Sequence, residues 1–316
     1  MSSTIRHRLA LAVAAALGAS APGPAAAQMP PDIAEKIAAI GRVVDPEKTA
    51  PIYAPLQEKE PYAGLKVARD VKYGPDGRNV LDVFVAEDAA GARPVIMFVH
   101  GGGYVRGNKR PPGSPFYDNV MVWAARNGMI GVNVEYRLAP QFPWPAGALD
   151  LGAAVHWVAD HIAAHGGDPA RVYLAGHSAG ATHVATYVAH REFHGPKGSG
   201  LAGAMLSSGI YDLTKTEGND GQVAYFGSER GLYRERSALP GLPNSNIPFM
   251  LSAAELDPPM FPDQLVLLKQ AMCASERGCV RSIVLPQHSH MSESYAINTA
   301  DTQLARQWLE FIRTGR

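Results

Sequence analysis

Cysteine is scarce in this sequence, because its 316 residues contain only Cys273 and Cys279. The segment around them offers too few further ligands for a zinc site, so we expect no metal. In an oxidising compartment, a pair at this spacing favours a disulfide, with two buried thiols as the alternative. Such a bridge would join the end of a helix to the next strand.

An excess of charge of either sign is also missing, because Lys plus Arg and Asp plus Glu both number 29. The chain has no basic block and no acidic tail, so it lacks the electrostatic signature of a protein that binds nucleic acid or anionic membranes. No long apolar run follows residue 27, and we therefore expect no membrane span. Nothing in the composition predicts an oligomeric state.

The first 27 residues have the pattern of a secretory signal peptide. Positive residues at 6–8 precede the apolar run from Leu9 to Ala19, and small residues precede Gln28. This order predicts cleavage after Ala27 and export to the periplasm or the medium. A membrane anchor is the alternative, but the apolar run is only about half the ~20 residues that a spanning helix needs.

From residue 65 onward, short apolar runs alternate with helical patterns, which predicts an α/β fold. The pattern indicates a mostly parallel central sheet with helices on both faces. Residues 67–73 and 80–85 flank the turn sequence Gly74-Pro75-Asp76-Gly77 and predict an antiparallel hairpin at one edge. The other predicted strands are 95–99, 130–134, 172–175, 204–207, 249–253 and 280–285, and the main helices are 117–126, 148–164, 261–273 and a last one to 311.

We expect residues 28–316 to form a single domain, since no linker or internal repeat divides them. Residues 28–64 are predicted to form an N-terminal arm, with a helix near residues 32–40 followed by irregular chain. Residues 210–247 are aromatic and rich in Gly and Pro, with little periodicity. We interpret them as a small cap over the crevice at the carboxyl ends of the strands, where such sheets bind ligands.

Ser178 lies in the stretch that the chemistry depends on. The apolar strand from Arg171 ends at Gly176, and a helix-forming run begins after Gly180. This strand–turn–helix context with Gly-x-Ser-x-Gly is typical of a nucleophile elbow, which holds a serine hydroxyl exposed in a strained turn. A serine hydroxyl also needs a base and an acid that orients the base.

Candidate partners follow downstream in the order acid, then histidine. Asp257 comes just after the predicted strand 249–253, with Glu255 as the rival acid. His290 comes after the last strand, with His288 as the rival base. We favour Asp257 because it lies past the strand end in the crevice, whereas Glu255 lies at the strand's edge. We favour His290 because its place just before the next helix suits contact with both Asp257 and Ser178. Replacing the two histidines singly distinguishes them.

A glycine-rich segment after the strand at residues 95–99 predicts an oxyanion hole. We expect the amides of Gly102 and Gly103 to act with that of Ala179, the residue after the nucleophile. Glycine lets the backbone approach a substrate oxygen closely. A phosphate-binding loop is the alternative, but neither of its glycine spacings is present, and we expect no cofactor.

Together these motifs resemble the α/β-hydrolase-fold carboxylesterases of the HGGG, or hormone-sensitive-lipase-like, group, over about residues 67–311. The resemblance implies hydrolysis of small to medium esters through an acyl-enzyme. The matching segments are His100-Gly101-Gly102-Gly103, Glu135-Tyr136-Arg137-Leu138-Ala139-Pro140, Pro143-Trp144-Pro145-Ala146 with Asp150, Gly176-His177-Ser178-Ala179-Gly180, Tyr225-Phe226-Gly227 and Glu255-Leu256-Asp257-Pro258-Pro259.

Two alternatives remain open at this point. An amidase or arylformamidase uses the same machinery on a C–N bond, and the segment from Ser208 to Leu213 is similar to one in such relatives. A catalytically silent binding protein on the same fold is the other, although silent relatives typically lack a triad member. Turnover of a p-nitrophenyl ester separates enzyme from binding protein.

Overall fold

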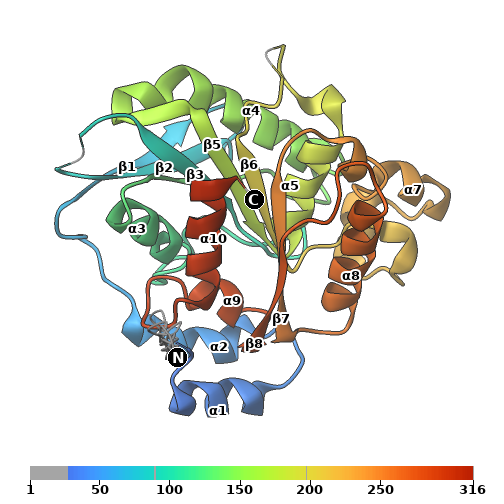
Figure 1. The fold of residues 1–316 in the computed structure, drawn as a ribbon, viewed down its shortest axis with the longest axis horizontal. Coiled ribbons are helices and arrows are strands. Elements are labelled where there is room, and N and C mark those ends of the chain that lie inside the picture. Colours follow the sequence, from blue (N-terminus) through green and yellow to red (C-terminus); the bar gives the residue numbers. More distant parts are fainter. Residues whose placement is uncertain (1–27, 89, 197, 316) are drawn as a thin grey trace, which may run out of the picture.

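The computed structural model describes residues 28–88, 90–196 and 198–315, and the predicted signal peptide lies outside these ranges. Its centre is an eight-stranded sheet with the order β1-β2-β4-β3-β5-β6-β7-β8 (Figure 1). β1 pairs antiparallel with β2, and β2 antiparallel with β4, whereas all later pairs are parallel. The predicted antiparallel hairpin at one edge is confirmed. The strands are Leu65–Lys72, Val80–Ala86, Arg93–Val99, Ile130–Val134, Gly167–His177, Gly203–Ser207, Phe249–Leu256 and Ser282–Ser289.

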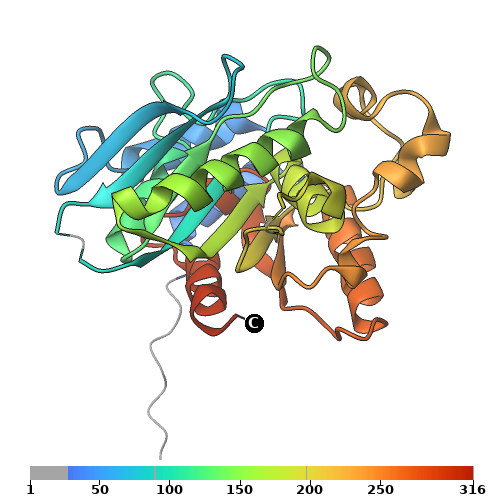
Figure 2. The same ribbon diagram turned by 90° about the horizontal axis from the view of Figure 1, so that it is seen from above.

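Helices cover both faces of the sheet. Successive side chains of a strand point to opposite faces, so each buried strand contributes apolar residues to both helix layers. In β3, Ile96 and Phe98 pack into one hydrophobic cluster with α1, α3 and α10, whereas Val95, Met97 and Val99 pack into another with α4, α5 and α8. The layers can be followed in Figures 1 and 2. These helices are Pro31–Ile40, Asp118–Arg126 and Gln303–Thr314 on the first face, and Ala146–His161, Ala179–Ala189 and Met260–Cys273 on the second.

The N-terminal segment is more regular than the irregular arm we expected after its first helix. It contains α2 (Pro46–Tyr53), which Asp45 caps by accepting a hydrogen bond from the Lys48 amide. Proline suits the first helical position because its missing N–H would be unpaired there. The Asp45-Pro46 pair was therefore the signal for this helix. The arm is tied down by Gln57, whose Nε2 donates to the carbonyl oxygens of Tyr295 and Ile297 at 2.8 and 3.0 Å.

The last strand also differs from the expectation, because β8 continues past the predicted end at residue 285. Its pairing with β7 is interrupted and then resumes at Ser289 opposite Leu256. β8 is an edge strand, where Pro286 is tolerated because an outward-facing position needs no N–H donor. The extension contains His288. His290 is the first residue after the strand, at its carboxyl end.

Residues 210–247 contain two short helices, α6 (Asp220–Phe226) and α7 (Tyr233–Arg236), and three single 3-10 turns. In both views this segment lies at one end of the molecule, drawn in yellow to orange (Figures 1 and 2). Its buried aromatic residues join Tyr104 and Ala179 in a third hydrophobic cluster. The segment thus packs directly on residues next to the predicted nucleophile and oxyanion loop.

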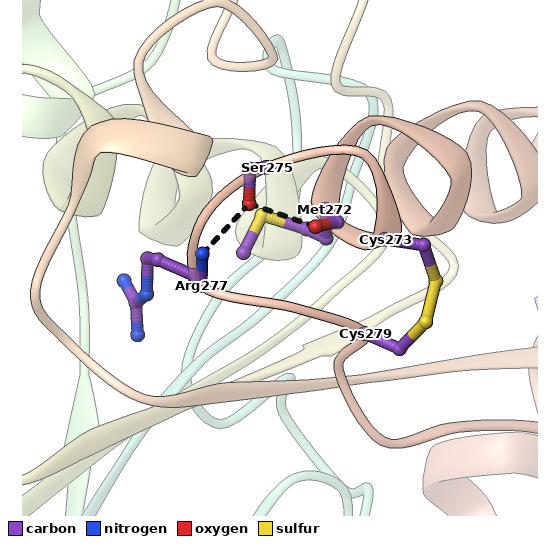
Figure 3. Close-up of a disulfide and its surroundings, with 5 residues drawn as sticks. All are labelled: Met272, Cys273, Ser275, Arg277 and Cys279. Carbon is purple, nitrogen blue, oxygen red and sulfur yellow. Dashed lines mark hydrogen bonds between the residues drawn. A yellow bond between two sulfur atoms is a disulfide. The ribbon is translucent and has the colours of Figure 1, made fainter.

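A disulfide joins Cys273, the last residue of α8, to Cys279 in the loop before β8 (Figure 3). This is the bridge that we expected from the spacing of the two cysteines. Ser275, between them, donates to the carbonyl oxygen of Met272 at 2.7 Å. In the part of the chain that the structure describes, no helix has both the length and the hydropathy needed to cross a membrane.

Candidate active site

Ser178 occupies the sharp turn between β5 and α5, with φ 58° and ψ −125°. A positive φ is costly for a residue with a side chain, and such strain is concentrated at functional sites. The neighbouring glycines explain why the turn forms. A Cβ on Gly176 would lie 2.5 Å from the oxygen of Gly180, and one on Gly180 would lie 2.1 Å from the oxygen of Val99. The sequence therefore folds here into the tight elbow predicted from it.

Asp257 follows β7 and is fully buried. Its Oδ2 accepts hydrogen bonds from the Ala254 amide at 2.8 Å and from Ser208 Oγ at 2.6 Å. Its Oδ1 lies 2.7 Å from His290 Nδ1. Burial opposes ionisation, but these bonds outweigh it and hold the pKa of Asp257 below its usual value. The group is thus an anionic acceptor aimed at one imidazole.

His290 follows the end of β8 and is also fully buried. Because a carboxylate only accepts hydrogen bonds, Nδ1 carries the proton in the bond to Asp257. Nε2 has no hydrogen-bond partner among the described residues. The ring is packed between those of Phe261 and His177, at centroid distances of 4.3 and 4.6 Å. In the neutral ring, Nε2 is then the nitrogen whose lone pair can accept a proton.

The rival residues lie elsewhere. His288 is buried, with Nε2 3.0 Å from Asp301 Oδ2 and Nδ1 3.1 Å from Ser292 Oγ. Glu255 is exposed and accepts a hydrogen bond from the Gln287 amide at 2.7 Å. The structure brings Asp257 to His290, and it gives each rival a different partner.

The side chain of His177 connects the end of β5 to the residue that follows β8. His177, beside Ser178, has Nε2 2.8 Å from the carbonyl oxygen of His290. The carbonyl accepts, so Nε2 of His177 is protonated. Burial, with a smaller contribution from His290, lowers the pKa of His177 to about 3. His177 therefore stays neutral and links the nucleophile turn to the loop that carries His290.

The glycine loop lies against the nucleophile. Gly102 and Gly103 have φ of 132° and 59°, and a Cβ on Gly101 would come within 3.0 Å of the Ser178 Cβ. A Cβ on Gly102 would meet the oxygen of Arg106 at 1.9 Å. Only glycine fits this course of the backbone. Ala179, whose amide is the third predicted donor, is the first residue of α5.

The glycine loop is held by residues for which the sequence predicted no role. Glu135, just after β4, lies with Oε1 2.8 Å from His100 Nε2, and its Oε2 accepts from the Lys109 amide at 3.0 Å. Arg78 pairs with the same carboxylate. Tyr136 donates its hydroxyl hydrogen to the His100 carbonyl at 2.8 Å. A buried acid directly after a buried strand was the available signal for this anchor.

The segment of residues 210–247 contacts the glycine loop. A Cβ on Gly221, in α6, would lie 2.3 Å from the oxygen of Gly103. The rings of Tyr104 and Tyr225 stack with centroids 5.3 Å apart. A cavity of about 670 Å³ lies between residues 215–222 and the first half of α8, and Met260 and Gln264 are among its lining residues. Another of about 730 Å³ lies between the arm and residues 110–118, and does not include Ser178, Asp257 or His290.

Comparison with known proteins gives a family match. Residues 96–240 match the model of the alpha/beta hydrolase fold. Esterase LipQ of Mycobacterium tuberculosis is 29% identical over 241 residues, which are 70% of this chain and 56% of LipQ. Carboxylesterase NlhH of the same species is 44% identical over 88 residues, 28% of this chain and 26% of NlhH. The chain thus spans little more than half of LipQ and less of NlhH.

Solved structures are similar over most of the chain. A bacterial heroin esterase covers 91% of this chain and 98% of its own, with a TM-score of 0.67 and 24% identity. A hyperthermophilic esterase from Pyrobaculum calidifontis covers 91% of this chain and 99% of its own, with a TM-score of 0.64 and 18% identity. At these identities the likeness establishes the fold, which is the α/β architecture expected from the sequence.

Proposed function

We propose that this chain, whose residues 96–240 match the alpha/beta hydrolase fold family, is a serine hydrolase that cleaves carboxylic esters through an acyl-enzyme. The observation that carries the proposal is the 2.7 Å contact between His290 Nδ1 and Asp257, which leaves Nε2 free. An imidazole in that state accepts a proton from a serine hydroxyl. Ser178, in its strained turn, is the nucleophile of the proposal.

In the proposed first half-reaction, Ser178 Oγ attacks the ester carbonyl carbon while His290 Nε2 takes the hydroxyl proton. The carbonyl oxygen becomes an anion, and we assign the amides of Gly102, Gly103 and Ala179 as its donors. Loss of one such donor typically costs about 3 kcal/mol of transition-state stabilisation. His290 then returns the proton to the leaving alcohol, and the C–O bond to the alcohol breaks.

In the second half-reaction, water attacks the acyl-enzyme and His290 takes one of its protons. The C–O bond to Ser178 breaks, the proton passes to Ser178 Oγ, and the carboxylic acid leaves. Asp257 stays ionised throughout, because it orients His290 and stabilises the imidazolium. Its lowered pKa supports this role.

Esters are preferred over amides in this proposal because the relatives carry the names esterase and carboxylesterase. The cap at residues 210–247 is assigned as the wall of the substrate crevice, within one domain that also includes the arm at residues 28–64. Its contacts with Gly103 and Tyr104 support that assignment.

Turnover of a short-chain p-nitrophenyl ester tests the proposal. We expect the mature protein, residues 28–316, to release p-nitrophenolate and the Ser178→Ala variant to lose at least 1000-fold in kcat. Circular dichroism is the control that both proteins are folded. A wild type without turnover, or a variant that keeps its rate, contradicts the proposal.

We also propose that the protein is exported, with residues 1–27 removed. The disulfide between Cys273 and Cys279 supports this, because structural disulfides persist mainly in oxidising compartments. Intact-mass measurement on protein from the periplasm and the medium tests it. We expect a chain that begins at Gln28, whereas an uncleaved chain in the cytosol contradicts export.

A further inference from the structure

A second acid lies behind the Asp257–His290 pair, and the mechanism above does not use it. Glu293, three residues after His290, is fully buried. Its Oε2 lies 2.5 Å from Ser208 Oγ, and its Oε1 lies 2.5 Å from Ser252 Oγ. Ser208 Oγ is in turn 2.6 Å from Asp257 Oδ2. A single serine hydroxyl therefore connects two buried carboxyl groups, one just after β7 and one in the short helix α9 (Ser292–Tyr295).

The single hydroxyl hydrogen of Ser208 decides which of the two carboxyl groups it donates to. Ser208 has one hydroxyl hydrogen, so it cannot donate to both carboxyl groups at once. Asp257 already accepts from His290 and from the Ala254 amide, as an ionised carboxylate does. If Glu293 carries a proton on Oε2, it donates to Ser208, and Ser208 donates to Asp257. Every hydrogen then has one acceptor.

The other side of Glu293 completes the same chain. Ser252 Oγ lies 2.8 Å from Ser207 Oγ as well as 2.5 Å from Glu293 Oε1. Ser207 can donate to Ser252, which then donates to Glu293 Oε1. The hydrogen bonds thus run in one direction, from Ser207 on β6 through Ser252 on β7 to Glu293, Ser208 and Asp257.

The charges around Glu293 favour its neutral form. Burial, followed by the charge of Asp257, raises the pKa of Glu293 to about 8, although the bonds from Ser208 and Ser252 oppose the shift. Burial, together with the charges of Glu293 and Asp257, raises the pKa of the nearby Tyr211, which therefore stays neutral. Within the described structure, no cation is among the groups that shift the pKa of Glu293. An ionised Glu293 would face Asp257 with nothing to balance it.

We propose that Glu293 is a positioning residue, which acts as a neutral hydrogen-bond donor to Ser208 and thereby holds Asp257 in the orientation that His290 requires. The inference rests on the proposed function, because it concerns the same catalytic site. Ionised Glu293 would instead draw the hydrogen of Ser208 to itself, and Asp257 would lose one of its three donors.

The test uses the pH dependence of kcat on a p-nitrophenyl ester, with the uncatalysed rate subtracted. We expect the wild type to lose several-fold in kcat above pH 8, with little change in KM. Glu293→Gln has an amide N–H that still donates to Ser208 and cannot ionise, so its rate should stay level through that range. Superimposable profiles for the two proteins overturn the proposal, as does a Glu293→Gln enzyme that is inactive at every pH.

Two further variants distinguish positioning from packing. Glu293→Ala and Ser208→Ala should each lower kcat at pH 7 by tenfold or more, and Glu293→Gln should restore most of the loss seen with Glu293→Ala. The double alanine variant should be no slower than Ser208→Ala alone, because both act on one path. Fully additive losses contradict that path. A wild type without turnover would instead refute the proposed function itself.

Discussion

At the residue scale, the candidate site depends on which carboxylate and which imidazole meet. The sequence predicted Asp257 and His290 from their order and their positions after strands, and the structure holds them 2.7 Å apart. The sequence did not predict Glu293, because its partners Ser208, just after β6, and Ser252, in β7, are distant along the chain. Their proximity is a product of parallel pairing and is not visible in the local sequence.

The first residue-scale prediction concerns the acid. Asp257→Asn should lower kcat by about 10⁴, because an amide fixes the wrong imidazole tautomer, as in other triads. Glu255→Gln is the matched control, since Glu255 is exposed and contacts the Gln287 amide. We expect this variant to keep kcat within about threefold. Equal losses in the two variants would contradict the assignment of Asp257.

The second prediction concerns the base. His290→Gln should lower kcat at least 1000-fold, whereas His288→Gln should mainly lower thermal stability, because His288 is paired with Asp301. Steady-state kinetics and thermal unfolding on both variants test this. A greater kcat loss for His288→Gln, in protein that is still folded, would mean that His288 and not His290 is the base.

At the scale of elements, the sheet was predictable because period-2 and period-3.6 patterns separate strands from helices. The sequence missed α2 and the end of β8 for different reasons. Pro51 lies inside α2 and is atypical of a helix interior, so the segment reads as loop although Asp45-Pro46 marks a helix start. In β8, Pro286 suggests an end to the strand, but the edge position tolerates it.

An element-scale prediction concerns the disulfide at the C-terminal end of α8. Replacing Cys273 and Cys279 together by Ala should lower the free energy of unfolding by about 2 kcal/mol, because the bridge closes a short loop. The rate of ester hydrolysis should persist, since Phe261, which contacts His290, lies at the other end of the helix. Urea unfolding and kcat test both parts. A loss of ester hydrolysis in a folded double variant would contradict this prediction.

At the scale of the whole molecule, buried titratable groups predict a stability maximum near neutral pH. Burial lowers the pKa of His177 and His183 to about 3. Between that value and ~6.5 the unfolded chain binds more protons, so stability rises with pH. The contribution of Glu293 to the pH dependence of stability has the opposite sign, because its pKa is raised to about 8. From ~4.3 to 8 the folded state holds the extra proton, and stability falls as pH rises.

The sum of these contributions should rise towards about pH 6.5 and then decline towards pH 8. Urea unfolding at several pH values measures the curve. Glu293→Gln should remove the decline, which amounts to about 1.4 kcal/mol per pH unit for one proton. A wild-type curve that is still rising from pH 6.5 to 8, or a variant with the same decline, contradicts the assignment of these buried groups.

The central claim is that Ser178 is the nucleophile, and covalent labelling tests it most directly. Treatment with an alkyl phosphonate ester, followed by peptide mass spectrometry, should locate one adduct on Ser178. His290→Gln should slow its formation at least 100-fold, because the base that activates the serine is missing. An adduct on another residue, or no adduct in a folded wild-type protein, would contradict the account.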